Sequence, residues 1–179
     1  MSAAAFVDES SMPSEMGHVY VLGIVRVLLA DEEECTGRLR LAAGRQERIH
    51  FAESSSILRS THVALVSELP AYITSIASAG PRRSEERTRR RILAAVFGSA
   101  SGFLDGVDSV VLESRGNALD LRDKSLIQQV SMFSDQKPRR IRHVGWRNQP
   151  MLWAADVVAG SVSRALVVGE AAPFPVNWI

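Results

Sequence analysis

Three acidic residues stand where apolar segments end or are interrupted, and an unpaired carboxylate is costly in such a place. Asp8 ends a short apolar run near the N-terminus, Glu113 ends the run 110–112, and Asp156 interrupts an apolar stretch that begins at Met151. An acid at the edge of a hydrophobic core loses hydration unless it is paired or binds a cation. Carboxylate oxygens are the hard ligands that Mg²⁺ and Mn²⁺ prefer. The three acids therefore predict a site for one of these ions.

Such a site would suit the hydrolysis of a phosphodiester bond. Two divalent ions roughly 3.5–4 Å apart can activate a water and stabilise the leaving oxygen. The sequence leaves a simpler interpretation open for each acid, namely a turn cap for Asp8, an ion pair with Arg115 for Glu113, and an ion pair with Arg164 for Asp156. The chemistry therefore depends on whether the fold brings the three carboxylates together.

Apolar periodicity and breaker residues predict a hairpin-rich start followed by alternating helices and strands. Strands are expected at about 3–8, 18–29, 47–52, 71–76, 109–113 and 140–144, with a hairpin loop at 11–17 and a further short strand within 38–43. Helices are expected from the serines 54–56 to about 68, from a Ser84 cap to about 104, at about 118–133 and at about 149–168, before an irregular tail. This order predicts an α/β fold, a mixed sheet with helices on both faces, in a single domain over residues 1–179.

The predicted strands place two of the acids at one edge of the sheet. Side chains alternate along a strand, so Asp8 and Ser10 share one face while Glu9 points to the other. The carboxyl ends of parallel strands meet at the same edge of an open sheet, where ligands bind. We therefore expect Asp8 and Glu113 to be neighbours.

The last predicted helix carries a polar stripe on an otherwise apolar surface. Gln149, Asp156 and Ser163 recur every seven residues and so lie on one side of the helix. Ala159 and Gly160, one turn after Asp156, are small enough to let this side approach the sheet closely. If the helix packs across the sheet edge, Asp156 meets the two strand acids.

Four short motifs occur in order along nearly the whole chain. They are Phe6-Val7-Asp8-Glu9-Ser10, Tyr20-Val21-Leu22-Gly23, Arg48-Ile49-His50-Phe51 and the stretch from Gln149 to Gly160 with its Ala155-Asp156 pair. Together they resemble the domain-of-unknown-function 3800 family of the ribonuclease H-like superfamily. The resemblance implies a ribonuclease H-like fold, which is a five-stranded mixed sheet whose first three strands are antiparallel.

The resemblance also implies which residues would carry the chemistry. Members of the superfamily commonly bind two metals with carboxylates on the first strand, on a later strand and on the last helix. Carried over, these roles fall on Asp8, Glu113 and Asp156, with Glu9 of the opening motif as a further catalytic candidate. Two features depart from the family pattern: the run 10–13 replaces a usual glycine, and the later-strand acid is often aspartate rather than glutamate. Either departure would alter the metal geometry or mark a weakened enzyme.

Several other polar residues have both a functional and a structural interpretation. His50 is a candidate proton donor or phosphate contact, or it satisfies a local hydrogen bond. Arg115 could contact a phosphate or form a salt bridge, and Asp120 has the spacing of a capping box as well as a possible metal role. Asp123 and Lys124 are expected on a solvated helix surface.

The basic residues are almost all arginines, because only two of the 21 Lys and Arg residues are lysines. A GC-rich coding bias gives the same composition. Two clusters stand out, Arg82, Arg83, Arg87, Arg89, Arg90 and Arg91, and, beside Trp146, Arg139, Arg140, Arg142 and Arg147. Arginines next to an aromatic ring suit single-stranded nucleic acid, so DNA or RNA is the expected partner. The alternatives are a solvated helix face and an edge strand protected by charge.

Composition bounds the remaining possibilities. The net charge of +1 says little about partners, and Cys35 is the only cysteine, so we expect no internal disulfide and a reducing, cytoplasmic environment. The stretch 151–169 is nearly long enough to span a bilayer, but Asp156 and Arg164 lie inside it and would be costly there. We therefore expect a buried helix and no membrane partner.

These observations predict a metal-dependent nuclease that cleaves DNA or RNA. The alternative is a catalytically degenerate domain that binds nucleic acid or a protein, which the altered run after Ser10 favours. A third class, the aspartyl-phosphate phosphatases, needs a second aspartate two residues after the first. Ser10 occupies that position, which ranks this class last.

Overall fold

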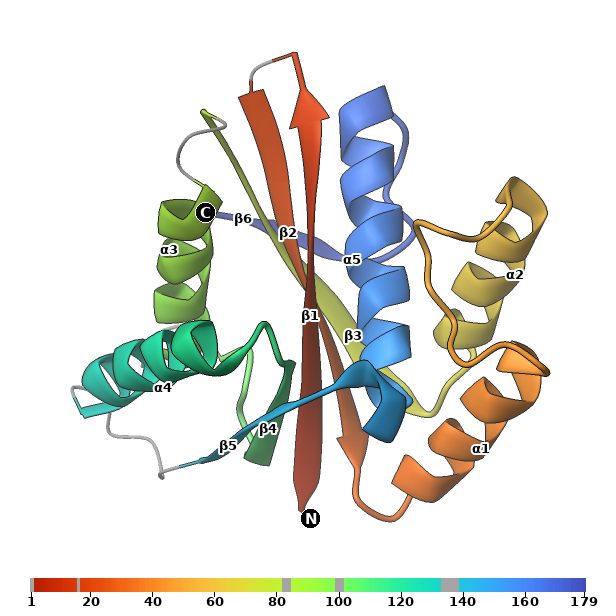
Figure 1. Cartoon of the computed structure of the whole chain (residues 1–179), viewed down its shortest axis with the longest axis horizontal. Coiled ribbons are helices and arrows are strands. Elements are labelled where there is room, and N and C mark those ends of the chain that lie inside the picture. Colours follow the sequence, from red (N-terminus) through yellow and green to blue (C-terminus); the bar gives the residue numbers. More distant parts are fainter. Residues whose placement is uncertain (1, 16, 82–84, 99–101, 133–138) are drawn as a thin grey trace.

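The computed structural model describes residues 2–15, 17–81, 85–98, 102–132 and 139–179. The elements follow in the order β1 (Ala3–Ser14), β2 (Gly17–Leu28), α1 (Glu32–Ala43), α2 (Ser56–Ser67), β3 (Ala71–Gly80), α3 (Glu85–Phe97), β4 (Val107–Glu113), α4 (Asn117–Met132), β5 (Arg140–Val144), a 3₁₀ turn (Trp146–Asn148), α5 (Met151–Val168) and β6 (Val176–Trp178). Helices α3 and α4 lie on one side of the sheet, and α1, α2 and α5 lie on the other (Figure 1).

The six strands form one mixed sheet in the order β5-β4-β1-β2-β3-β6. The first three strands are antiparallel, since β1 pairs with β2 and β2 pairs with β3 in that sense. Strands β4 and β5 run parallel to β1, and β6 runs parallel to β3 at the other edge. The predicted α/β class with a mixed sheet and helices on both faces is confirmed, and β1 lies inside the sheet.

Strand β1 divides its side chains between two hydrophobic cores. Ala4 and Phe6 pack into the core that contains Met151 and other residues of α5. Ala5 and Val7 point to the opposite core, beneath α3 and α4. Complete burial of an apolar side chain stabilises the fold by roughly 1.5–3 kcal/mol. This alternation on both faces fixes the register of β1, so Asp8 must face α5 and Glu9 must face α3 and α4.

Two glycines allow α5 to pack closely against its neighbours. A Cβ on Gly23 of β2 would lie 2.5 Å from the Ala155 carbonyl oxygen and 2.8 Å from the Ala159 nitrogen. A Cβ on Gly160 would lie 2.5 Å from the ring of Phe51. Ala159 therefore lies against the sheet as the sequence predicted, whereas the prediction is wrong for Gly160, which faces Phe51 in the loop before α2.

Helix α5 is the one described helix that is long and apolar enough to cross a membrane, by length and composition only. Of its 18 residues, 72% are buried inside the molecule. The predicted buried helix is therefore observed.

The strand predicted within 38–43 is wrong, because this segment is the second half of α1. Cys35, Leu39 and Ala43 recur every four residues and are buried on one face of the helix. Gly44 ends the helix with a φ of +58°, a conformation that favours glycine. The acids of the first turn and this glycine were the sequence signals for a helix.

The strand predicted at 47–52 is wrong as well. Ile49 and Phe51 are buried, as a strand pattern suggests, but within the described residues the segment pairs with no strand. The backbone N–H of Phe51 instead donates to the Asp156 side chain. The third antiparallel strand is β3, which corresponds to the strand predicted at 71–76.

The other predicted elements are present, with shifted ends. β1 continues to Ser14, so most of the predicted loop 11–17 is strand, and α3 ends at Phe97 rather than near 104. The tail expected to be irregular contributes β6. The predicted Ser84 cap and the end of the helix predicted to reach 133 lie outside the described residues.

The close contact between α5 and β2 can be tested by adding one methyl group. Gly23→Ala should lower the free energy of unfolding by about 1–3 kcal/mol, because the added Cβ overlaps backbone atoms of α5. Gly37→Ala is the matched control, since a Cβ on Gly37 in α1 meets no atom within 4 Å. That change should stabilise the helix by up to about 1 kcal/mol. Urea unfolding measures both, and equal stability of Gly23→Ala and the wild type would contradict the packing.

Candidate metal site

Asp8 and Glu113 lie at equivalent places on neighbouring parallel strands. The register of β1 and β4 pairs Val7 with Leu112, so the two acids are the next residues of their strands. Asp8 is 8% exposed, and its Oδ1 accepts a hydrogen bond of 2.8 Å from the N–H of Glu9. The predicted neighbourhood of the two strand acids is therefore observed.

Asp156 reaches the same place from α5. Its Oδ2 accepts a hydrogen bond of 2.8 Å from the N–H of Phe51, which orients the carboxylate. Farther along the helix, the hydroxyl of Ser163 lies 2.8 Å from that of Ser10 on β1, so the polar stripe of the helix follows the strand. The structure thus brings together the three acids that the sequence singled out.

The three acids line one cavity of about 100 Å³. The cavity is also lined by Glu9, by the segment 48–50 and by the apolar side chains of Trp146, Leu152 and Trp153. Burial raises the pKa of Asp8 well above its ordinary value, and the negative charges of Glu113 and Asp156 raise it further. Burial also raises the pKa of Asp156, although the Phe51 N–H and the neighbouring His50 and Arg48 act against this. The surroundings of Asp8 and Asp156 therefore disfavour the ionised forms of their carboxyl groups.

The donor set fits Mg²⁺ or Mn²⁺ by its chemistry. The Asp8 carboxyl holds a proton more tightly than an ordinary aspartate does, because burial and the negative charges of Glu113 and Asp156 disfavour its ionised form. A divalent cation could replace that proton, since it favours oxygen ligands and opposes the repulsion. Among the residues that the structure describes, however, no three acidic, histidine or cysteine side chains are already arranged to hold an ion. Binding would therefore require the carboxylates to turn toward a common point.

The simpler interpretations of the acids are met only in part. Asp8 accepts a local backbone hydrogen bond, as a capping residue would. The described ion pairs of Arg115 are with Glu9, Glu86 and Asp123 rather than with Glu113. Asp156 accepts its hydrogen bond from Phe51.

Glu9, a catalytic candidate in the sequence, faces the opposite side of the sheet. Its Oε2 lies 2.6 Å from Nε of Arg89, and its Oε1 lies 3.5 Å from Nε of Arg115. The same two arginines lie within 3.5 Å of Asp123, at 2.9 and 3.5 Å. Glu9 also borders the carboxylate cavity, but its charge is matched by arginines, and it connects β1 to α3 and α4.

The prediction that Asp123 is solvated is wrong, whereas Lys124 is exposed as expected. The Asp123 side chain is 1% exposed, and its Oδ2 also lies 3.4 Å from Nε2 of His143. Asp123 lies in the second turn of α4, where Arg89 of α3, Arg115 and His143 of β5 reach its carboxylate. The charges of the two arginines offset the desolvation of this carboxylate.

Asp120 has a local structural role. Its carboxylate accepts hydrogen bonds from the Ser114 hydroxyl at 2.6 Å and from the Arg115 N–H at 3.0 Å. Burial opposes ionisation, but these bonds prevail and lower the pKa of Asp120. The carboxylate therefore holds the turn between β4 and α4, but through Ser114 and Arg115 rather than through Asn117, which the capping-box spacing would require.

His50 lies on an irregular segment beside Asp156 rather than at the end of a strand. Its Nδ1 lies 3.0 Å from the Glu53 carboxylate, which is the local pairing that the sequence left open. The residue also lines the cavity with the three acids, so both interpretations of His50 hold geometrically. Arg48, two residues earlier, lines the cavity too and was not predicted. Its membership in a motif next to His50 was the only signal.

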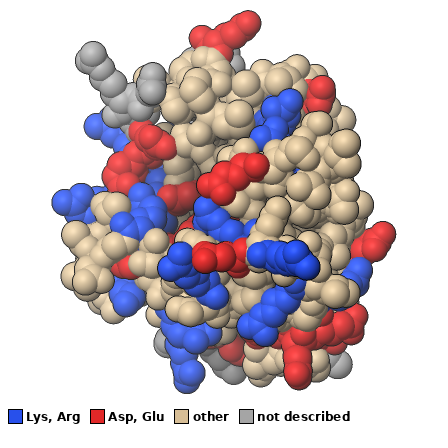
Figure 2. All heavy atoms as spheres, turned by 45° about the vertical axis from the view of Figure 1, so that its right-hand side comes forward, with Lys and Arg blue, Asp and Glu red and all other residues tan. Residues whose placement is uncertain are grey.

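The arginine clusters divide between structural and exposed positions. Arg89 is 2% exposed and belongs to the ion-pair network that it forms with Glu9, Asp123 and Arg115. Arg87 and Arg90 are exposed. In the second cluster, Arg140 and Arg142 are exposed on the edge strand β5. Arg82 and Arg83 lie outside the described residues. Figure 2 shows basic and acidic side chains intermingled across one face, so the charge there is mixed rather than gathered by sign.

Solved structures with a similar arrangement include ribonucleases. A chain in the structure of the PCNA:RNase HII complex from Archaeoglobus fulgidus matches with a TM-score of 0.60 and 14% identity, over 94% of this chain and 74% of that chain. Ribonuclease H2 from Pyrococcus horikoshii OT3 matches with a TM-score of 0.57 and 16% identity, over 97% of this chain and 81% of that chain. The chain has a ribonuclease H-like fold. At these identities the likeness establishes the fold alone.

The comparisons of sequence add no family. No family model matches the chain, so the resemblance to the domain-of-unknown-function 3800 family stays a prediction. No curated protein matches it either.

The raised pKa of Asp8 predicts an unusual pH dependence of the stability of the metal-free protein. Because the pKa of Asp8 is higher in the folded chain than its ordinary value of 3.8, the folded state binds this proton more tightly. The resulting stability is present at low pH and is lost as the pH rises from about 4 through the raised pKa. In chelator, Asp8→Asn should therefore melt at a higher temperature than the wild type at pH 8, and the difference should narrow toward pH 5.

Thermal unfolding at several pH values measures this difference. For a chain of this size, 1 kcal/mol appears as a shift of about 2–4 °C in Tm. A wild type that is more stable than Asp8→Asn at pH 8 would show that the carboxylate is well compensated without a cation.

The ion-pair network predicts contrasting effects at two adjacent positions. Asp123→Ala should lower the free energy of unfolding by about 3–5 kcal/mol, because it leaves the buried guanidinium of Arg89 without one of its carboxylates. Lys124→Ala, on the exposed face of the same helix, should change it by about 0.5 kcal/mol or less. Urea unfolding compares the two variants, and similar effects would contradict the burial of Asp123.

Proposed function

We propose that the chain is a divalent-metal-dependent nuclease that hydrolyses phosphodiester bonds of DNA or RNA. The observation that carries the proposal is the convergence of Asp8, Glu113 and Asp156 on one cavity, where two of the acids raise the pKa of the third. Acids with strongly raised pKa values in a cleft are more common at functional sites than elsewhere. A bound cation would attract all three carboxylates and so offset the repulsion between them.

In this proposal Asp8, Glu113 and Asp156 hold Mg²⁺ or Mn²⁺. The ion, when bound, supplies an activated water and positive charge for the leaving oxygen. Trp146, Leu152 and Trp153 line the same cavity and limit the access of bulk water. Charges interact more strongly where water is excluded, so these apolar walls strengthen the hold of the acids on an ion and on a phosphate.

Three polar groups have defined tasks around the carboxylates. The Phe51 N–H holds Oδ2 of Asp156 in place. Arg48 borders the cavity and can donate to a phosphate oxygen with its planar guanidinium. The pairing of His50 Nδ1 with Glu53 leaves Nε2 as the ring atom that exchanges a proton with a substrate oxygen.

The fold supports a nucleic-acid substrate. Two of the similar structures are RNase HII from Archaeoglobus fulgidus, in a complex with PCNA, and ribonuclease H2 from Pyrococcus horikoshii OT3. At 14% and 16% identity these neighbours leave open the choice between DNA and RNA, which the substrate panel below decides.

Cleavage by the purified protein is the direct test. Labelled single strands, duplexes and RNA–DNA hybrids should be cleaved in Mn²⁺ or Mg²⁺ and remain intact in chelator. Asp8→Asn should reduce cleavage to the background level, because the variant loses a ligand oxygen charge at the centre of the site. The cleavage rate is measured by gel under single-turnover conditions.

A matched control uses an acid on the strand that carries Glu113. Asp108 is exposed on β4, before the buried part of that strand, so Asp108→Asn should cleave at the wild-type rate. Cleavage by Asp8→Asn at the same rate as Asp108→Asn would refute the assignment.

A non-catalytic nucleic-acid- or protein-binding domain is the second candidate, and one observation favours it. The acids are not already arranged to hold an ion among the described residues, and β1 continues to Ser14 where the family pattern has a glycine. Calorimetric titration separates the two functions. Heat of Mn²⁺ binding that disappears in Asp8→Asn supports the nuclease, and no detectable binding supports the second candidate.

A further inference from the structure

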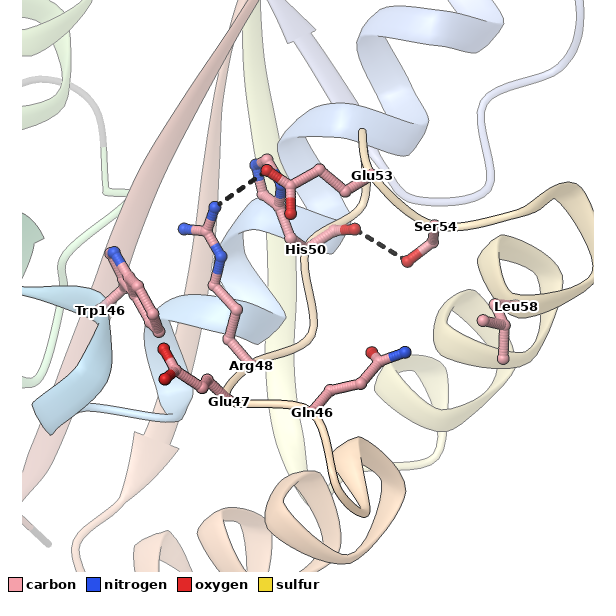
Figure 3. A pocket seen from close by; sticks show the side chains of 8 residues that line it. All are labelled: Gln46, Glu47, Arg48, His50, Glu53, Ser54, Leu58 and Trp146. Atoms are coloured by element: carbon pink, nitrogen blue, oxygen red, sulfur yellow. Dashed lines mark hydrogen bonds and ion pairs between the residues drawn. The ribbon is translucent and has the colours of Figure 1, made fainter.

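A hollow of about 510 Å³ lies beside the carboxylate cavity and has no part in the chemistry described so far. It is bounded by the segment between α1 and α2, by the start of α2 and by the turn before α5 (Figure 3). Its volume is within the range of roughly 300–1,000 Å³ that is typical of ligand sites. A volume of this size admits a group much larger than a metal ion or a water.

The hollow and the carboxylate cavity share a wall. Arg48, His50 and Trp146 line both of them. A ligand in the hollow would therefore lie next to any bond that is cleaved at the carboxylates. This position suits a part of the substrate that flanks the reacting phosphate.

The shared wall carries an aromatic ring with guanidinium groups over it. The guanidinium carbon of Arg48 lies 4.4 Å from the centre of the Trp146 ring, and that of Arg147 lies 5.0 Å from it. Nucleic-acid-binding proteins stack unpaired bases on aromatic rings and on guanidinium planes. Trp146 is half-buried, so part of its ring surface is open to a ligand.

Hydrogen bonds fasten both sides of this wall to the helix that carries Asp156. The Trp153 Nε1–H on α5 donates to the carbonyl oxygen of Trp146 at 2.9 Å. On the other side, Phe51 donates to Asp156, and Arg59 of α2 donates to the Phe51 carbonyl at 3.0 Å. The hollow therefore keeps a fixed position relative to the acids.

The remaining walls offer polar groups and exchangeable charges. The Gln46 side chain extends into the open space (Figure 3), and its amide makes no hydrogen bond with another described residue. The acids at this place, Glu47 and Glu53, pair with Arg147 and Arg48 through carboxylates that are 70% exposed. Exposed pairs of this kind contribute little to stability, so a phosphate can take the place of the acid.

We propose that this hollow holds an unpaired nucleotide of the substrate, next to the phosphate that is cleaved. The base stacks on the Arg48–Trp146 pair, the Gln46 amide contacts the edge of the base, and Arg147 or Arg48 contacts the backbone phosphate. The substrate class is therefore single-stranded nucleic acid, or a duplex with an unpaired nucleotide at the cleaved position. This inference rests on the proposed nuclease function.

Binding without cleavage tests the inference separately from the chemistry. All variants are made in the Asp8→Asn background and are studied in chelator, with a short fluorescein-labelled single strand as the probe and anisotropy as the readout. Trp146→Ala should weaken binding roughly 5- to 150-fold, the range for the loss of one base–aromatic stack. Trp146→Phe should retain most of the affinity, because it keeps an aromatic face.

Two further variants keep the test independent of the folding of Trp146→Ala. Arg48→Lys keeps the charge and loses the plane, and Gln46→Ala removes an exposed amide, so both should weaken binding in a fully folded protein. Tyr72→Ala is the matched control. Tyr72 also carries an arginine over its ring, at 4.9 Å, but it lines a hollow that shares no residue with this one.

A blunt duplex of the same sequence should bind more weakly than the single strand. Trp146→Ala should leave the affinity for this duplex unchanged. The inference is overturned if the single strand does not bind, if the three hollow variants bind it as Tyr72→Ala does, or if the duplex depends on Trp146 equally. Each of these results leaves the metal-dependent cleavage assay, with its own Asp8→Asn comparison, to decide the nuclease function by itself.

Discussion

The candidate site depends on the close contact of α5 with the central strands. The absence of a side chain on Gly23 lets the backbone of α5 at Ala155 approach β2 to a distance that no other residue would allow. Asp156 follows directly on the helix and is thereby brought into an apolar setting beside two strand acids. The electrostatic cost of this arrangement is what a divalent cation would relieve, so packing and chemistry are set by the same contact.

Strand β1 separates two kinds of buried acid. Burial raises the pKa of both acids, but the carboxylates that Asp8 faces raise its pKa further, whereas the arginines 89 and 115 on the opposite side of the sheet lower that of Glu9. Adjacent residues of one motif therefore differ in role because a strand turns successive side chains to opposite faces. Glu9 and Asp123 have cationic partners within 3.5 Å, whereas the groups next to Asp8 are carboxylates, and this difference is the basis for proposing Asp8 rather than Glu9 as a metal ligand.

Two irregular segments supply further residues beside the acids that the sheet and α5 carry. The loop before α2 supplies Arg48 and His50, and the 3₁₀ turn before α5 supplies Trp146. Both segments are tied to α5 by hydrogen bonds, which is how residues outside regular structure can hold a defined position next to the acids. The neighbouring hollow thus shares a wall with the cavity that holds the three acids.

The sequence by itself determined the strands β1, β2, β3, β4 and β5, the buried character of α5, and the three acids, because apolar periodicity and isolated acids are local patterns. The strand expected within 38–43 was wrong because the helix signals at the ends of α1 outweighed a strand-like alternation. The strand expected at 47–52 was wrong because Ile49 and Phe51 are buried, as in a strand, but the segment pairs with no described strand. The sequence also misjudged Asp123, since the arginines that make its burial tolerable come from α3 and the end of β4. Only the tertiary structure decided these points, together with the place of Arg48 and Trp146 beside the acids, because each depends on contacts between residues that are far apart in the chain.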